Sequence, residues 1–184
     1  MGNFYVSLSK FLSYILRHHP EKFDICLDDK GFADLEKILR ILKNRYPKKK
    51  ITKKTLQEMI KRSNKKRFEL REKKIRAYYG HSIDRKIKME KAEMIPSFLF
   101  HGTTAKAYKK IQKLGLKKRN RQYVHLSKTI ETAIDVGSRK TNRPILLRID
   151  VLRAKKSGIN FYKSGDMYLA ERIPPRFLEK QDLN

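Results

Sequence analysis

An arginine and two histidines lie at the end of an apolar helical segment in the stretch YILRHHP, Tyr14–Pro20. Titratable rings beside a fixed cation suit a helix cap, a metal site or a site that handles phosphate. On this stretch alone the cap is the simplest explanation. A cap needs only one cation, however, whereas Arg17 and His18 together offer an anion both a charged clamp and a proton donor.

Basic residues recur at two further places along the chain. KKRFEL places Arg67 at the start of an expected strand, and RNRQYVHLS places Arg121 before a strand that carries His125 and Ser127. Both stretches could bind phosphate. Both also fit ordinary structure, namely a solvated basic run in the first case and surface arginines beside one core histidine in the second.

FHGTT combines a ring, a glycine and a hydroxyl at His101, Gly102 and Thr103. The glycine would let a ligand approach the backbone closely, and Thr103 could cap the next helix, whose N-terminus attracts anions. The pattern is short and common by chance. The chain has neither G-x-G-x-x-G nor G-x-x-x-x-G-K-[ST], so neither a Rossmann site nor a P-loop is predicted.

The five histidines and the single cysteine lack the spacing of metal ligands, so no metal is expected. Cys26 is expected to be a small core residue in a reducing compartment. No apolar run approaches the ~20 residues that span a bilayer, and no secretory signal is visible. A cytoplasmic protein that does not enter membranes is therefore predicted.

The charge is strongly positive, with 46 Lys and Arg against 19 Asp and Glu and a formal net charge of +27. Such a balance predicts attraction to polyanions, weakened by salt, and nucleic acid is the favoured partner. The alternative is a lysine-rich surface that serves only solubility or thermal tolerance.

The elements that would position these residues follow from the apolar spacing. A helix is expected from an N-cap at Ser7 to a stop before Pro20, with His19 on its apolar face and Arg17 on the opposite side. Two further helices are expected, the second beginning at Thr52, and then a hairpin formed by RFEL and KIRAYY. Three helices followed by a basic hairpin is the order of a winged helix.

The highly charged segment 82–96 is expected to link two lobes. Beyond it, short strands alternate with helices, which indicates an α+β lobe. The strands are expected at FLFHG, YVHLS, PILLRIDV, NFYKS and MYLAERIP, and the helices from Lys106 to Leu114 and from Thr129 to about Arg139.

Seven motifs occur along the chain in the following order: SKFLSYILRHHP, GFADLEKIL, NKKRFEL, IRAYYGHS, FHGTT, RQYVHLS and IPPRFL. Together they resemble the RNA 2′-phosphotransferase (tRNA 2′-phosphotransferase) family over essentially the whole chain. The resemblance implies an α+β protein with a winged-helix RNA-binding lobe at 1–94 and an ADP-ribosyltransferase-like, mixed α/β NAD-binding lobe at 95–184. It also implies NAD as a consumed co-substrate, no metal, and an RNA partner with an internal 2′-phosphate, as in tRNA splicing. A monomer is expected.

The resemblance assigns residue roles by matching motifs. The catalytic group would be Arg17, His18, Arg67 and Arg121. The NAD-binding residues would be His101, Gly102, Thr103, His125, Ser127, Gly137 and Arg139. Many protein-modifying relatives of the NAD lobe carry a catalytic glutamate where this chain has Met167, although Glu171 lies nearby.

The implied reaction removes the 2′-phosphate through an ADP-ribosylated RNA intermediate and releases nicotinamide and ADP-ribose 1″,2″-cyclic phosphate. Two alternatives stay open: ADP-ribosylation of terminal phosphates of RNA or DNA, and RNA binding without catalysis. The presence of all four catalytic-type residues argues against the binder. The terminal-phosphate enzyme would use the same clamp, so the sequence does not separate it from the 2′-phosphotransferase.

Overall fold

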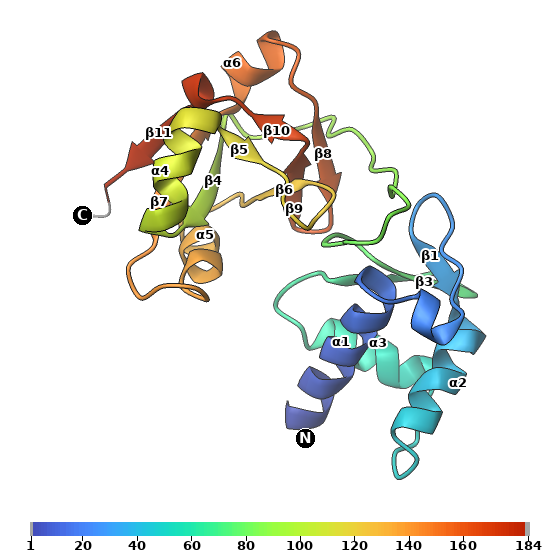
Figure 1. Ribbon diagram of the computed structural model, residues 1–184. Helices are drawn as coiled ribbons and strands as arrows, with labels where there is room; N and C mark the ends of the chain where they lie inside the picture. The colour runs from blue at the N-terminus through green and yellow to red at the C-terminus, as the bar shows by residue number, and fades with distance from the viewer. Residues whose placement is uncertain (1, 183–184) are drawn as a thin grey trace. The chain divides into compact units, whose positions relative to one another are not determined.

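The computed structural model describes residues 2–182, and the chain forms two compact units, unit 1 (residues 1–88) and unit 2 (residues 89–184). Figure 1 labels the elements of each unit. Residues 2–182 contain six α-helices and four small sheets, all antiparallel, so the predicted α+β class is confirmed.

The first helix of unit 1, α1 (Gly2–Arg17), begins five residues earlier than expected. Ser7 therefore does not cap it but lies within it, with its hydroxyl 3.1 Å from that of Tyr46. The predicted apolar face is buried, and the helix ends before Pro20, whose ring disfavours helical backbone at the preceding residue. The buried face consists of Leu8, Leu12, Ile15 and Leu16.

The position of His19 differs from the prediction. It follows the end of α1, its side chain is 37% exposed, and its Nδ1 lies 3.1 Å from a carboxylate oxygen of Glu21. The prediction that His19 points into the apolar face is therefore wrong, because the helical rotation used to place it stops at Arg17.

The two other α-helices of unit 1 have side-chain caps, of which the one at Thr52 was predicted and the one at Asp34 was not. Asp34 accepts a hydrogen bond from the backbone N–H of Lys37 at 2.7 Å, and Thr52 forms a reciprocal capping box with Thr55. These caps satisfy donors that the first helical turn leaves without partners. The helices are α2 (Leu35–Arg45), the 3₁₀ turn η1 (Glu21–Phe23) and α3 (Lys53–Lys61).

The sheet of unit 1 has the order β1-β3-β2 and includes the two predicted hairpin strands, β2 (Phe68–Leu70) and β3 (Lys74–Ala77). Strand β1 (Phe32–Asp34) was not predicted, because three residues are too few to show an alternating pattern. Cys26 is exposed, so its predicted core position is wrong. Its neighbours Ile25 and Leu27 fill the core from this stretch instead.

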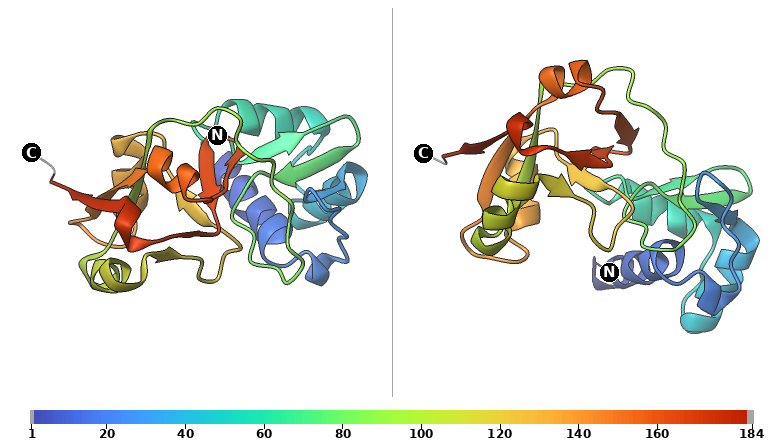
Figure 2. Two further views of the ribbon diagram at one scale, coloured as in Figure 1. Left: turned by 90° about the horizontal axis from the view of Figure 1, so that it is seen from above. Right: turned by 45° about the horizontal axis from the view of Figure 1, so that its top comes forward.

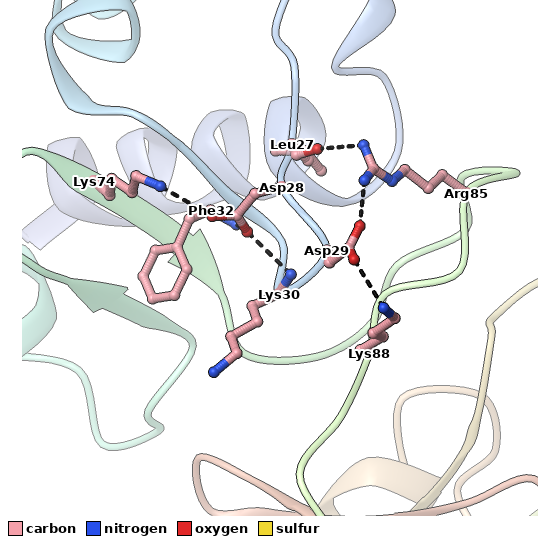
Figure 3. A network of polar contacts seen from close by, with 8 residues as sticks. All are labelled: Leu27, Asp28, Asp29, Lys30, Phe32, Lys74, Arg85 and Lys88. Carbon is pink, nitrogen blue, oxygen red and sulfur yellow. Dashed lines mark hydrogen bonds and ion pairs between the residues drawn. The ribbon is translucent and has the colours of Figure 1, made fainter.

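Residues 82–97 form no helix and no named strand between β3 and β4, as the green segment in Figure 2 shows. The beginning of this segment is bound to unit 1. Arg85 and Lys88 both pair with Asp29, Arg85 donates to the carbonyl of Leu27 at 2.9 Å, and Ile87 is buried (Figure 3). Residues 82–88 are therefore an integral edge of unit 1 rather than free chain.

Unit 2 is built on two three-stranded sheets and one two-stranded sheet, with strand orders β11-β7-β4, β6-β9-β8 and β10-β5. Phe100 and Ser127 exchange backbone hydrogen bonds of 2.9 and 2.8 Å, which join β4 to the end of β6. The strands are β4 (Phe98–Thr103), β5 (Leu116–Lys117), β6 (Val124–Leu126), β7 (Ile145–Asp150), β8 (Phe161–Ser164), β9 (Met167–Ala170), β10 (Arg172–Ile173) and β11 (Leu178–Gln181).

The helices of unit 2 cover these sheets, and two of them were predicted. Thr104, not Thr103, caps α4, because its hydroxyl accepts from the N–H of Ala107 and Thr103 is still in the strand. Thr129 caps α5 as expected, whereas α6 was not predicted. The helices are α4 (Ala105–Leu114), α5 (Ile130–Gly137), α6 (Val151–Lys156) and the 3₁₀ turn η2 (Pro175–Phe177).

Candidate active site

Arg17 is held at the C-terminal end of α1 by contacts from the sheet of unit 1. Its guanidinium carbon lies 5.6 Å from the ring centre of Phe68 and 5.1 Å from that of Tyr79, and it donates to the carbonyl of Arg67 at 3.4 Å. Gly80 leaves room for it, because a Cβ there would lie 3.3 Å from an Arg17 nitrogen. The guanidinium is therefore oriented by two aromatic rings and one backbone carbonyl.

His18 is oriented by a serine of the segment that follows β3. Its Nδ1 lies 2.7 Å from the hydroxyl of Ser82, and the N–H of Ser82 donates to the carbonyl of Arg17 at 2.9 Å. The two contacts tie the end of α1 to the G-H-S stretch 80–82. Ser82 was not predicted as a site residue, although its place in the motif IRAYYGHS was a signal.

Arg67 is fixed in the same way by a serine of the loop between α3 and β2. Its Nη1 donates to the hydroxyl of Ser63 at 2.7 Å, and this hydroxyl donates to the carbonyl of Lys65 at 2.9 Å. Unit 1 therefore brings together three of the four predicted catalytic side chains, Arg17, His18 and Arg67. Two serines that were not predicted hold two of them.

A third histidine, His81, lies behind this cluster and is 2% exposed. Neither of its ring nitrogens has a hydrogen-bond partner within residues 2–182. Burial, and then the charges of Arg17, His18 and Arg76, lower the pKa of His81 from 6.5 to about 4. His81 is therefore a neutral ring at physiological pH, which adds no further positive charge beside Arg17.

A cavity of about 710 Å³ opens beside the cluster and lies entirely within unit 1. It is lined by one face of α1, the end of α3 and the loop that leads to β2. Its basic lining residues are Lys10, His18, Arg62, Lys65 and Arg67. This volume is in the range of typical ligand pockets, and the lining is suited to an anion.

In unit 2, strands β4 and β6 place two histidines side by side. Nδ1 of His101 lies 3.0 Å from the carbonyl of His125, and Nδ1 of His125 lies 3.1 Å from the carbonyl of Tyr123. Because a carbonyl can only accept, both rings carry their proton on Nδ1. Burial lowers the pKa of His101, which keeps that ring neutral and gives its Nε2 the character of an acceptor.

Gly102 has a packing role that differs from the predicted approach of a ligand. A Cβ at Gly102 would lie 2.0 Å from the carbonyl oxygen of Ala133 and 3.1 Å from the backbone nitrogen of Gly137. Gly137 is equally confined, because a Cβ there would lie 2.8 Å from Pro144. The two glycines allow α5 to pack directly on the backbone of β4.

The other predicted NAD-binding residues fall around this contact. The hydroxyl residues Thr103 and Ser127 are buried at the ends of β4 and β6, whereas Arg139 is exposed just after α5. Arg121 is exposed in the turn before β6, in unit 2, so it does not share a unit with the other three catalytic candidates.

Met167 and Glu171 are the two residues near the position where many protein-modifying relatives carry a catalytic glutamate, and both lie at strand β9. Met167 is buried at the start of β9, and Glu171 is exposed directly after the strand ends. No structural feature gives Met167 a part in acid–base chemistry, and the role of Glu171 remains unassigned.

In residues 2–182 no three His, Cys, Asp or Glu side chains lie together in a way that could hold a metal ion. In the same part of the chain no helix is long and apolar enough to cross a bilayer.

Residues 4–171 match the family model described as "RNA 2′-phosphotransferase, Tpt1 / KptA family". A "Probable RNA 2′-phosphotransferase" of Bacillus thuringiensis subsp. konkukian is 42% identical over 95% of both chains. One from Acetivibrio thermocellus is 41% identical over 95% of this chain and 96% of the relative. One from the archaeon Thermococcus kodakarensis is 38% identical over 91% and 92%.

Proposed function

The chain belongs to the RNA 2′-phosphotransferase (Tpt1/KptA) family, a family of transferases that use NAD, and we propose that it removes an internal 2′-phosphate from RNA with NAD as consumed co-substrate. The observation that carries the proposal is the cluster of Arg17, His18 and Arg67 in unit 1, with its supporting serines. The expected RNA is a spliced tRNA that retains a 2′-phosphate at its junction.

In the first step, the RNA 2′-phosphate attacks the anomeric carbon of the nicotinamide ribose and nicotinamide leaves. This step needs a dianion held in line with a sugar that becomes cationic. Arg17, Arg67 and Arg121 suit the clamp, because guanidinium groups offer forked donors and do not release protons at neutral pH. The product is an RNA whose 2′-phosphate carries ADP-ribose.

In the second step, the 2″-hydroxyl of the same ribose attacks the phosphorus. The RNA leaves with a free 2′-hydroxyl, and the phosphate leaves as ADP-ribose 1″,2″-cyclic phosphate. His18 can give a proton to a phosphoryl oxygen or to the leaving RNA oxygen, since an imidazole titrates near neutral pH. Its Nδ1 contact with Ser82 fixes the orientation of the ring.

Unit 2 is proposed to bind NAD through four neutral side chains and one arginine. His101 and His125 present acceptor nitrogens, and Thr103 and Ser127 add hydroxyls close to them. These groups fit the hydroxyls and amide of a nucleotide. Arg139 at the end of α5 offers a charge suited to the pyrophosphate, and Gly102 and Gly137 act by keeping α5 close to β4.

Unit 1 is proposed to be a winged-helix lobe that binds the RNA. Three helices and the antiparallel sheet β1-β3-β2 support this assignment, and the net charge of +27 for the whole chain supports RNA binding. Residues 1–94 would form this lobe and its connection, and residues 95–184 an ADP-ribosyltransferase-like lobe.

The test is incubation with NAD and an oligonucleotide that bears one internal 2′-phosphate, followed by mass analysis of both products. We expect loss of the phosphate from the RNA only when NAD is present, release of one nicotinamide per phosphate, and no effect of EDTA. Loss of phosphate without NAD, or inhibition by the chelator, would contradict the proposal.

A parallel reaction with an oligonucleotide that carries a terminal phosphate separates the main alternative. An enzyme that only ADP-ribosylates terminal phosphates would leave ADP-ribose attached to that oligonucleotide and the internal 2′-phosphate in place. That outcome would replace the proposed function with the alternative, because the first step would proceed without the second.

A further inference from the structure

The cavity in unit 1 extends well beyond the cluster of Arg17, His18 and Arg67. Its wall includes Tyr5, Val6, Ser9, Lys10 and Ser13 of α1, which share one face of the helix because they are spaced by about four residues. This face adjoins the buried leucine face, because Tyr5 and Ser9 lie three residues before Leu8 and Leu12 on the same helix. From Tyr5 to His18 the helix rises about 20 Å, at 1.5 Å per residue.

The length and chemistry of this groove fit a strand of nucleic acid. Phosphates along one stacked strand recur about every 3.4 Å, so a stretch of about 20 Å accommodates several nucleotides. Arg62 supplies positive charge beside Tyr5, at the end remote from His18, and Lys10 supplies it between the two ends. Lys65 supplies it two residues before Arg67. Small side chains on α1, Ser9 and Ser13, keep the floor of the groove open.

The remote end also holds a preformed flat surface. The guanidinium carbon of Arg62 lies 5.2 Å from the ring centre of Tyr5, and the Tyr5 hydroxyl donates to a carboxylate oxygen of Glu58 at 2.8 Å. The ring is thereby fixed from one side by Glu58 and covered by Arg62 on another. Aromatic rings and arginine planes of this kind are the groups on which unpaired RNA bases stack.

From this geometry we infer that the groove along α1 binds the RNA strand that flanks the 2′-phosphorylated nucleotide, with one base stacked at Tyr5 and Arg62 and one phosphate bound by Lys10. The inference rests on the proposed function, since it takes the 2′-phosphate to lie at the His18 end. It makes the RNA flank, and not only the phosphate, part of what this chain recognises.

The test compares a dinucleotide that carries the internal 2′-phosphate with two longer RNAs, extended by four nucleotides on its 5′ or its 3′ side. For the unmodified protein, we expect extension on one of the two sides to lower KM by about tenfold. In Lys10→Glu and Arg62→Ala, this gain should shrink several-fold. The dependence of RNA binding on log salt, measured with a 2′-hydroxyl RNA and no NAD, should lose about one unit of slope in Lys10→Glu.

Lys43→Glu is the matched control, because Lys43 is exposed on α2, does not line the groove and changes the net charge by the same amount. It should keep the gain from extension. If extension on neither side lowers KM, or if Lys10→Glu and Lys43→Glu behave alike, the groove does not bind the RNA flank. An inactive dinucleotide together with inactive longer RNAs would instead contradict the proposed function itself.

Discussion

In unit 1, side-chain hydroxyls orient two of the predicted site residues, His18 and Arg67, whereas in unit 2 backbone carbonyls orient the predicted site residues His101 and His125. In unit 1 the hydroxyls of Ser82 and Ser63 each lie 2.7 Å from the group that they hold. In unit 2, His101 and His125 donate to carbonyls near and within a sheet. The first arrangement carries positive charge, and the second is neutral.

The difference has a chemical reason. A phosphate that changes its bonding needs charge and proton transfer at fixed positions, which side-chain hydroxyls can tune one group at a time. Recognition of a nucleotide needs neutral donors and acceptors in a rigid frame, which a sheet supplies. Substitutions in unit 1 should therefore change turnover with little loss of stability, whereas substitutions in unit 2 should often change both.

The largest effect is expected for His18→Ala, which should accumulate RNA that carries ADP-ribose on its 2′-phosphate. Nicotinamide leaves without needing a proton, whereas the RNA alkoxide leaves poorly without one, so acid–base help of about 10²–10⁴ belongs to the second step. Mass analysis of a single turnover would detect the intermediate. His19→Ala is the control, because His19 pairs with Glu21 outside the cluster. A His18 variant that stalls before nicotinamide release would refute the assignment.

Arg17→Ala and Arg121→Ala test whether one reaction draws on both units. Loss of one preorganised donor typically reduces turnover by about 10²–10³, and we expect each variant to lose at least that much while NAD binding persists. Turnover and NAD affinity should be measured separately. An unchanged rate for Arg121→Ala alone would confine catalysis to unit 1, and unchanged rates for both would show that the residue assignment is wrong.

Gly102→Ala tests whether the close backbone contact between β4 and α5 stabilises unit 2. The added methyl would meet the Ala133 carbonyl at 2.0 Å, so α5 must move, and we expect about 1–3 kcal/mol of lost stability with weaker NAD binding. Gly158→Ala is the control. A Cβ at Gly158 meets nothing within 4 Å, so any loss of stability there comes only from the backbone φ of +85°. Equal stability of Gly102→Ala and the unmodified protein in denaturant unfolding would contradict the packing role.

His81→Leu tests the neutral ring behind the cluster. The pKa of His81 is about 4 in the folded chain and 6.5 when unfolded, so the unfolded chain binds the extra proton between these values. Stability is therefore complete above pH 6.5 and falls as the pH drops, by about 2 kcal/mol at pH 5. His81→Leu should remove this part of the acid sensitivity, seen in unfolding at pH 7 and pH 5. An unchanged difference between the two pH values would mean that His81 is not the responsible group.

Much of this arrangement could be predicted from the sequence, because helices of nine residues or more show their period and caps. The faces of α1, α2 and α3 and the cap at Thr52 follow from apolar spacing and one hydroxyl. The short strands β1, β5 and β11 were not predicted, since two to four residues define no period, whereas β2 and β3 are equally short but were predicted around the turn REKK. Their pairing is decided by partners distant in sequence.

The supporting shell of the site was the least predictable part. Ser63 is 4 residues from Arg67 and Ser82 is 64 residues from His18, and only Ser82 lies within one of the family-like motifs, IRAYYGHS. Gly102 was predicted to admit a ligand, although the space that it leaves is filled by α5. Such roles depend on which backbones meet, which residue types and spacing alone do not specify.

The smallest effect is expected for Ser82→Ala. This variant tests most directly whether side chains orient the predicted site residues of unit 1. One hydrogen bond contributes about 0.5–1.5 kcal/mol, so turnover should fall by about two- to tenfold, with the loss in the second step. Because Ser82 acts through His18, Ser82→Ala should add nothing further in a His18→Ala background. Additive losses would mean that Ser82 acts elsewhere. Ser63→Ala should behave in the same way toward Arg67. No substitution can delete the backbone carbonyl that holds His101. Only in unit 1 can the orienting groups therefore be removed one at a time.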